Sequence, residues 1–89
     1  MREMGSSFNH GFRFEVALDV LGALLAHWSE AAPDALDAAN PDPGRLAEIE
    51  AEQRKWRNLR HDLDPRDLAQ IDSGTAEHAP LARRLYAAA

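Results

Sequence analysis

Apolar residues between Phe12 and Ser29 recur at helical spacing, and this pattern constrains the fold more than any other feature of the chain. One row is spaced every three or four residues, as in an amphipathic helix: Phe14, Leu18, Leu21, Leu25 and Trp28. A second row widens the apolar surface: Val16, Val20, Ala23 and Leu24. A single partner helix would leave part of this broad surface in water. We therefore expect a helix over 12–29 at the centre of a bundle or an interface.

A second helix is predicted from Pro43 to Leu63. Asp42 is a favourable N-cap, and Pro43 suits the first helical position, where no backbone N–H is needed. The buried side is a narrow stripe of the kind found in helix hairpins and coiled coils, formed by Leu46, Ile49, Gln53, Trp56, Leu59 and Leu63. Residues 30–43 contain three prolines, which an α-helix interior tolerates poorly, so we expect this segment to connect the two helices.

The ends of the chain give weaker patterns. Residues 1–11 hold two glycines, two serines and an asparagine, and they are predicted to form a flexible arm. Asp64 is the predicted cap of a third helix that starts at Pro65. That helix either ends near Gly74 or continues imperfectly to His78, because glycine inside a helix costs about 1 kcal/mol relative to alanine. Pro80 is predicted to open a last short helix.

These elements together predict the fold class, since no segment alternates as a strand would. We expect an all-α protein, a small helical bundle built on a two-helix antiparallel hairpin (about 12–29 and 43–63). One or two short C-terminal helices complete it. The organisation predicted is a flexible arm, residues 1–11, followed by a single helical domain, residues 12–89.

Residues that could carry chemistry are sparse. The chain has no cysteine, which excludes disulfides, thiolate metal sites and cysteine nucleophiles. Its four histidines include no pair three or four residues apart, so no local metal motif is present. Ser73 lies in an ordinary turn sequence, and no glycine-rich phosphate loop occurs. The sequence therefore predicts no catalytic residue, no metal site, no cofactor and no enzymatic activity.

Charge is distributed unevenly along the second helix. The formal net charge is −5, opposite to that of a protein that wraps nucleic acid. Residues 28–52 hold seven acids and one base, whereas residues 53–61 hold four bases and no acid. This helix therefore changes sign near its midpoint.

The sign change allows the second helix to pair with a copy of itself. Residues whose numbers sum to 105 form matched pairs: Leu46 with Leu59, Ile49 with Trp56, Glu48 with Arg57, and Glu50 with Lys55. An antiparallel two-fold axis between Glu52 and Gln53 would generate all four pairs at once. The predicted dimer interface is accordingly Leu46, Ile49, Gln53, Trp56 and Leu59. The alternative is that this helix packs on the first one within a monomer.

Two functions fit these features. The first is a protein-interaction module, expected to be a homodimer that acts as a regulator, adaptor or neutralising partner of another, basic protein. The alternative is nucleic-acid binding through the basic patch 54–61, with contacts from Arg54, Lys55, Arg57 and Arg60. No membrane partner is expected, because no apolar run approaches about 18 residues. The absence of a signal-peptide pattern favours the cytoplasm, and the alanine-rich, arginine-rich composition favours a bacterial source.

Overall fold

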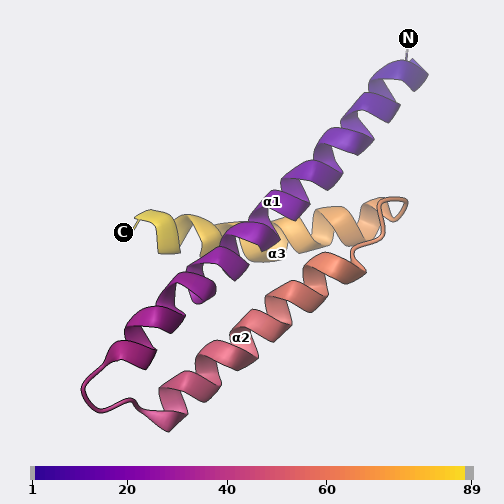
Figure 1. Cartoon of the computed structure of the whole chain (residues 1–89). Helices are drawn as coiled ribbons and strands as arrows, with labels where there is room; N and C mark the ends of the chain where they lie inside the picture. Colours follow the sequence, from indigo (N-terminus) through magenta and orange to yellow (C-terminus); the bar gives the residue numbers. More distant parts are fainter. Residues whose placement is uncertain (1, 88–89) are drawn as a thin grey trace.

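The structure is a computed structural model that describes residues 2–87, with the side chains of residues 9–86. The described chain forms three helices: α1 (Arg2–Asp37), α2 (Pro43–Asp62) and α3 (Leu68–Ala87). The prediction of an all-helical fold is confirmed for this range. Figure 1 shows that the chain reverses after α1, that α2 returns beside it, and that α3 crosses α1.

Helix α1 extends beyond both of its predicted ends. Residues 2–11, predicted as an arm, are helical, while Met1 lies outside the described residues. A contact remote in sequence holds this part of the helix: the His10 imidazole hydrogen-bonds the carbonyl oxygen of Pro65. The local composition of residues 1–11, which predicted a flexible arm, gives no sign of this helix, because a partner 55 residues away leaves no trace in it.

The other end of α1 was also placed wrongly. The helix passes through Pro33 and ends at Asp37, although the prolines of residues 30–43 had predicted a connection from residue 30 on. An interior proline removes one helical hydrogen bond and costs about 3 kcal/mol. The proline is flanked on both sides by strong helix formers, namely Ala31, Ala32, Ala35 and Leu36. The helix continues only four residues past the proline.

Helix α2 matches its prediction to within a residue. It starts at Pro43 and ends at Asp62, and the Asp42 side chain accepts a hydrogen bond of 2.9 Å from the Gly44 N–H. This is the N-cap that the Asp-Pro pair predicted.

Helix α3 differs from its prediction at the start and in the middle. The carboxylate of Asp67, not that of Asp64, accepts from a first-turn N–H, that of Gln70, at 3.0 Å. Asp64 instead accepts from the Arg66 N–H at 2.9 Å and so stabilises the preceding turn. The helix is continuous through Gly74 and Pro80, because residues beyond the proline pack on the core. There is therefore one C-terminal helix in the described chain, where the sequence predicted one or two short ones.

The core forms where α1 meets the other two helices. Helix α1 packs against both α2 and α3, which confirms its predicted central position. The buried cluster draws on all three helices and on the α2 C-cap, and consists of Ala17, Leu21, Leu24, Trp56, Leu63, Ile71 and Ala82. Helices α2 and α3 meet through side chains, because the Trp56 and His78 rings lie edge to face at 4.9 Å between centroids.

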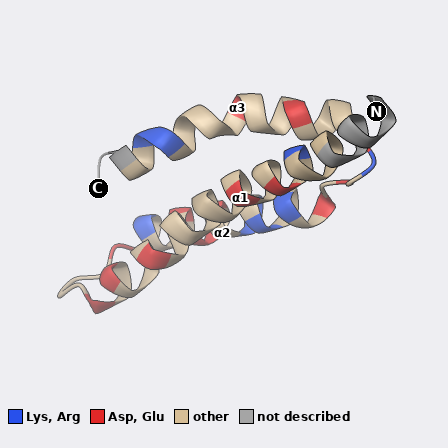
Figure 2. Cartoon of the chain, turned by 90° about the horizontal axis from the view of Figure 1, so that it is seen from above, with Lys and Arg blue, Asp and Glu red and all other residues tan. Residues whose placement is uncertain are grey.

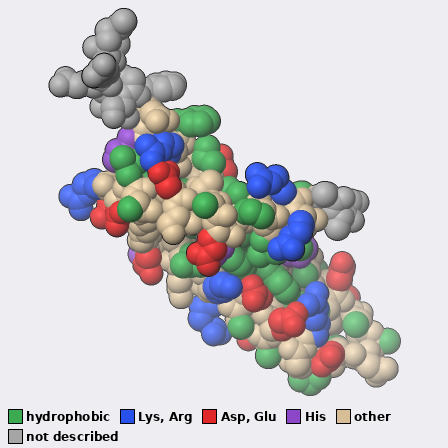
Figure 3. Space-filling view, turned by 180° about the vertical axis from the view of Figure 1, so that it is seen from behind, with side chains coloured by type: hydrophobic (Ala, Val, Ile, Leu, Met, Phe, Trp, Pro, Cys, Tyr) green, Lys and Arg blue, Asp and Glu red, His purple; other side chains and the backbone are tan. Residues whose placement is uncertain are grey.

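The molecule is elongated and exposes more surface than its mass predicts. Its dimensions are 60 × 25 × 17 Å, and its radius of gyration is 16.1 Å. A compact chain of this length has a radius of gyration of about 12 Å. The accessible surface is 6433 Å², against about 5,200 Å² for a typical folded monomer of 9.9 kDa. Hydrophobic side chains also remain visible on the back of the molecule, among charged ones (Figure 3).

Candidate interaction surface

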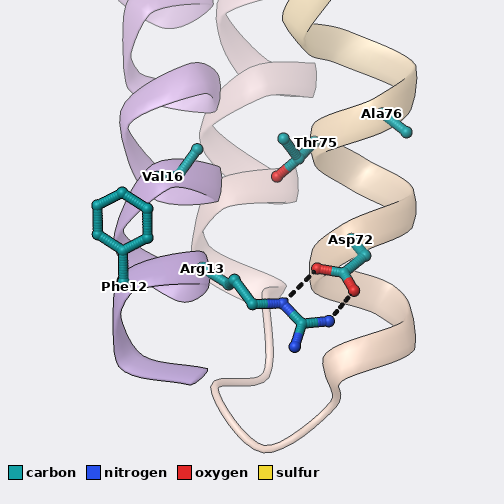
Figure 4. A pocket seen from close by; sticks show the side chains of 6 residues that line it. All are labelled: Phe12, Arg13, Val16, Asp72, Thr75 and Ala76. Atoms are coloured by element: carbon teal, nitrogen blue, oxygen red, sulfur yellow. Dashed lines mark hydrogen bonds and ion pairs between the residues drawn. The ribbon is translucent and has the colours of Figure 1, made fainter. Parts of the chain in front are cut away.

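Helices α1 and α3 run in the same direction and share a register. The Arg13 guanidinium on α1 bonds the Asp72 carboxylate on α3 through two nitrogens, with 3.0 Å from Nε to Oδ1 (Figure 4). Further toward the C-terminal ends of both helices, the Tyr86 hydroxyl on α3 lies 3.4 Å from the Ala23 carbonyl oxygen on α1 and donates to it. These contacts tie the two helices together at both ends of their shared length.

An open apolar groove lies between these two contacts. It consists of two adjoining cavities, of about 270 and 420 Å³, that share Val16 and Thr75. We call it the α1–α3 groove; its lining side chains are Phe12, Arg13, Val16, Asp19, Val20, Ala23, Asp72, Thr75, Ala76, Ala79, Ala82, Arg83 and Tyr86. The larger cavity lies toward the end of α3, where the helix moves away from α1 (Figure 2).

The groove combines exposed aromatic rings with unpaired charges. Phe12 is 58% exposed and Tyr86 is 55% exposed, and they stand at opposite ends. Asp19 lies on the α1 wall and Arg83 on the α3 wall, and neither forms an ion pair with any described residue. An apolar concavity with aromatic ends and charged edges is typical of protein-binding surfaces.

The Arg13–Asp72 pair sets the electrostatics of the narrow end. The hydrogen bond from Arg13 holds the pKa of Asp72 below its ordinary value, and the same bond raises the pKa of Arg13. Both groups are solvent-exposed, so the pair adds little to stability and serves mainly to fix the helix register.

The residues of the predicted dimer seam lie on α2, outside the groove, and two of them are buried within the chain. Ile49 is 2% exposed and Trp56 is 1% exposed. Leu46 and Gln53 are half-buried, and Leu59 is 40% exposed. A second copy therefore cannot contact the two central seam residues while α2 rests on the core. The packing instead matches the monomer alternative, in which the second helix packs on the first.

The predicted nucleic-acid contacts are all exposed on α2. Arg54, Lys55, Arg57 and Arg60 face water. The Lys55 ammonium lies 4.6 Å from the centre of the Trp56 ring, and Arg60 Nε is 3.4 Å from the Leu18 carbonyl oxygen. Because the Trp56 ring is buried, it is not available to stack on a base.

The titratable residues do not converge on a metal site within the described part of the chain. No group of three histidine, aspartate or glutamate side chains gathers there. The four described histidines have separate surroundings. His10 contacts the Pro65 carbonyl, His27 lies edge to face with Trp28, His61 lies 3.2 Å from Asp62, and His78 packs on Trp56.

Sequence reasoning found one wall of the groove and missed the other. The second apolar row of α1 was identified as surplus surface, and Val16, Val20 and Ala23 of that row line the groove. The α3 wall was missed because a helix break was expected at Gly74 and a new start at Pro80. A helical spacing that crosses Pro80 could have revealed it, in Thr75, Ala79, Ala82 and Tyr86.

Comparison of the chain with protein-family models, with curated proteins and with solved structures gave no match. Among the described residues, no helix combines the length and the hydropathy that a membrane span requires.

Proposed function

We propose that this protein is a small non-enzymatic interaction module that binds another protein chain through the α1–α3 groove. The observation that carries the proposal is the open apolar concavity of about 420 Å³, with the half-exposed Tyr86 ring at its edge. Tyrosine is among the residues that most often dominate the binding energy of a protein interface. Burying an apolar side chain there stabilises a complex by roughly 1.5–3 kcal/mol.

An acidic end offers a second surface for a regulator or adaptor. Acidic positions cluster where α1 passes into α2 (Figure 2). The exposed ones are Glu30, Asp34, Asp37, Asp42, Glu48 and Glu50. Such a surface favours a basic partner by electrostatic steering. We assign it the role of contacting the protein that the module regulates or neutralises.

A photo-crosslinking experiment tests the groove. Tyr86 is replaced by benzoylphenylalanine, an aromatic residue of similar shape, and the matched control carries the same residue at Asn58, on the exposed side of α2. Irradiation of cells that express each variant is expected to give one discrete adduct from position 86 and none from position 58. Adding Ala79→Glu, which places a charge on the apolar wall, is expected to abolish the adduct without loss of helicity by circular dichroism.

Mass spectrometry then identifies the cross-linked chain and the peptide in the groove. Equal labelling at both positions, or no adduct at position 86, would contradict the proposed function. An adduct that survives Ala79→Glu would place the contact outside the groove.

The second candidate function, nucleic-acid binding, is favoured by one observation. Four cations stand exposed on the second half of α2, and Arg54 and Arg57 have no ion-pair partner among the described residues. They could contact phosphates. The buried Trp56 leaves this surface without a base-stacking element, so we rank it second.

A further inference from the structure

We infer that the chain in the α1–α3 groove is a second copy of this protein, placed by a two-fold axis that sets Asp19 of each protomer against Arg83 of the other. This inference rests on the proposed function, since it names the occupant of the same groove. It replaces the α2 seam as the self-association surface.

The exposed surface of the molecule is large enough to accommodate a second copy. The chain exposes about 1,200 Å² more than a typical monomer of its mass. A stable interface of ordinary size buries about 800 Å² on each partner. The surplus exceeds that area, so a second copy matches it in size, while the charges and side chains of the groove walls locate the contact.

The two walls of the groove carry opposite charges. A two-fold axis along the groove lays α1 of one protomer over α3 of the other, so each wall meets the opposite wall. The α1 wall carries Asp19 and the α3 wall carries Arg83, both without ion partners among the described residues. The symmetry thus produces two opposite-charge contacts. This local attraction acts against the general repulsion between two chains of net charge −5.

The apolar side chains of the groove walls allow close packing. The side chains between the charges are small or β-branched, namely Val16, Val20, Ala23, Ala79 and Ala82. Small side chains let two helices approach closely, and the exposed Phe12 and Tyr86 rings would then be covered at the two ends. The groove contains no buried unpaired polar atom that would oppose an apolar contact.

Two single charge reversals test the geometry directly. In a homodimer of Asp19→Arg, each contact between positions 19 and 83 would join two cations. In a homodimer of Arg83→Asp, each contact would join two anions. Each variant alone is expected to dimerise about tenfold more weakly than the wild type, a change of about 1.4 kcal/mol. Mixed together, they are expected to form a heterodimer, because both cross-protomer contacts regain opposite charges. Native mass spectrometry counts the three species.

The matched control uses Glu48→Arg and Arg57→Glu, which reverse the charges of the α2 seam. These two variants are expected to dimerise as the wild type does and to mix at random. Preferential pairing of this control pair would move the interface to α2 and overturn the inference. So would random mixing, or failure to mix, of the position-19 and position-83 variants.

A third measurement separates this inference from the proposed function. Light scattering that finds the wild type monomeric at about 100 μM, a concentration that populates any dimer of micromolar affinity, would overturn the second copy as occupant. In that case the proposed function would be supported only if the adduct formed from position 86 contained a different protein. Failure of both experiments would remove both conclusions.

Discussion

At the scale of single residues, Trp56 contributes most to the fold. Its indole is 1% exposed, its Nε1 donates to Glu52 at 2.9 Å, and its ring meets the His78 ring of α3. Replacing a buried tryptophan by alanine removes this packing and leaves a cavity, at a cost of about 3–5 kcal/mol. We expect Trp56→Ala to lower the free energy of unfolding by that amount in urea denaturation. Leu36→Ala, at a side chain 61% exposed, is the control and should change it by less than about 0.5 kcal/mol.

Asp72 makes a pH-dependent contribution at the same scale. The Arg13 hydrogen bond lowers its pKa below the ordinary value of 3.8. A carboxylate with a lowered folded-state pKa stabilises the fold above its unfolded-state pKa, and that contribution is lost as pH falls through the folded-state pKa. We expect a carbon NMR titration to give Asp72 a midpoint below 3.8. Arg13→Gln should raise it toward that value. An equal midpoint in both proteins would show that the pair does not form.

At the scale of elements, Gly74 tests whether α3 is continuous. Its backbone is helical, and a Cβ built on it meets nothing within 4 Å. Alanine there should therefore stabilise the protein by about 0.5–1 kcal/mol, through the higher helix propensity and the stiffer unfolded chain. Gly44→Ala is the matched control, since its Cβ would lie 3.3 Å from the Asp42 oxygen that caps α2. It should gain less. A loss of stability in Gly74→Ala would instead indicate the helix break that the sequence suggested.

The same elements show what sequence alone can predict. Helix α2 was found almost to the residue because its determinants are local: an Asp-Pro start and a regular stripe. The N-terminal part of α1 and its alignment with α3 depend on partners far along the chain, such as Pro65 for His10 and Asp72 for Arg13. At Pro80, packing of the following residues on the core outweighs local propensity, and the groove between α1 and α3 could not be predicted without such remote contacts.

At the scale of the whole molecule, charge separation bears on the nucleic-acid alternative. Apart from Arg45, the exposed cations of α2 lie within residues 54–60, and the chain carries a net charge of −5. With Trp56 buried, any binding would be electrostatic and would weaken steeply with salt. We expect fluorescence anisotropy to show no saturable binding of a labelled single-stranded oligonucleotide at physiological salt, and no change in the tryptophan emission of the protein. Saturable binding that is lost in Arg54→Ala/Arg57→Ala would favour the alternative.

The surplus surface of the whole molecule predicts that stability depends on protein concentration. A dimer that covers the α1–α3 groove couples folding to association, so each tenfold rise in concentration adds about 1.4 kcal/mol per mole of dimer. For two chains of this length, that corresponds to a rise in Tm of about 3–6 °C. We expect this slope in the wild type by calorimetry over a hundredfold range, and none in Ala79→Glu, whose groove wall carries a charge. A wild type whose Tm is the same over the whole concentration range would mean that the groove stays open to water or binds a different protein. In that case a different partner would have to cover the groove of a molecule whose accessible surface, 6433 Å², is larger than its mass predicts.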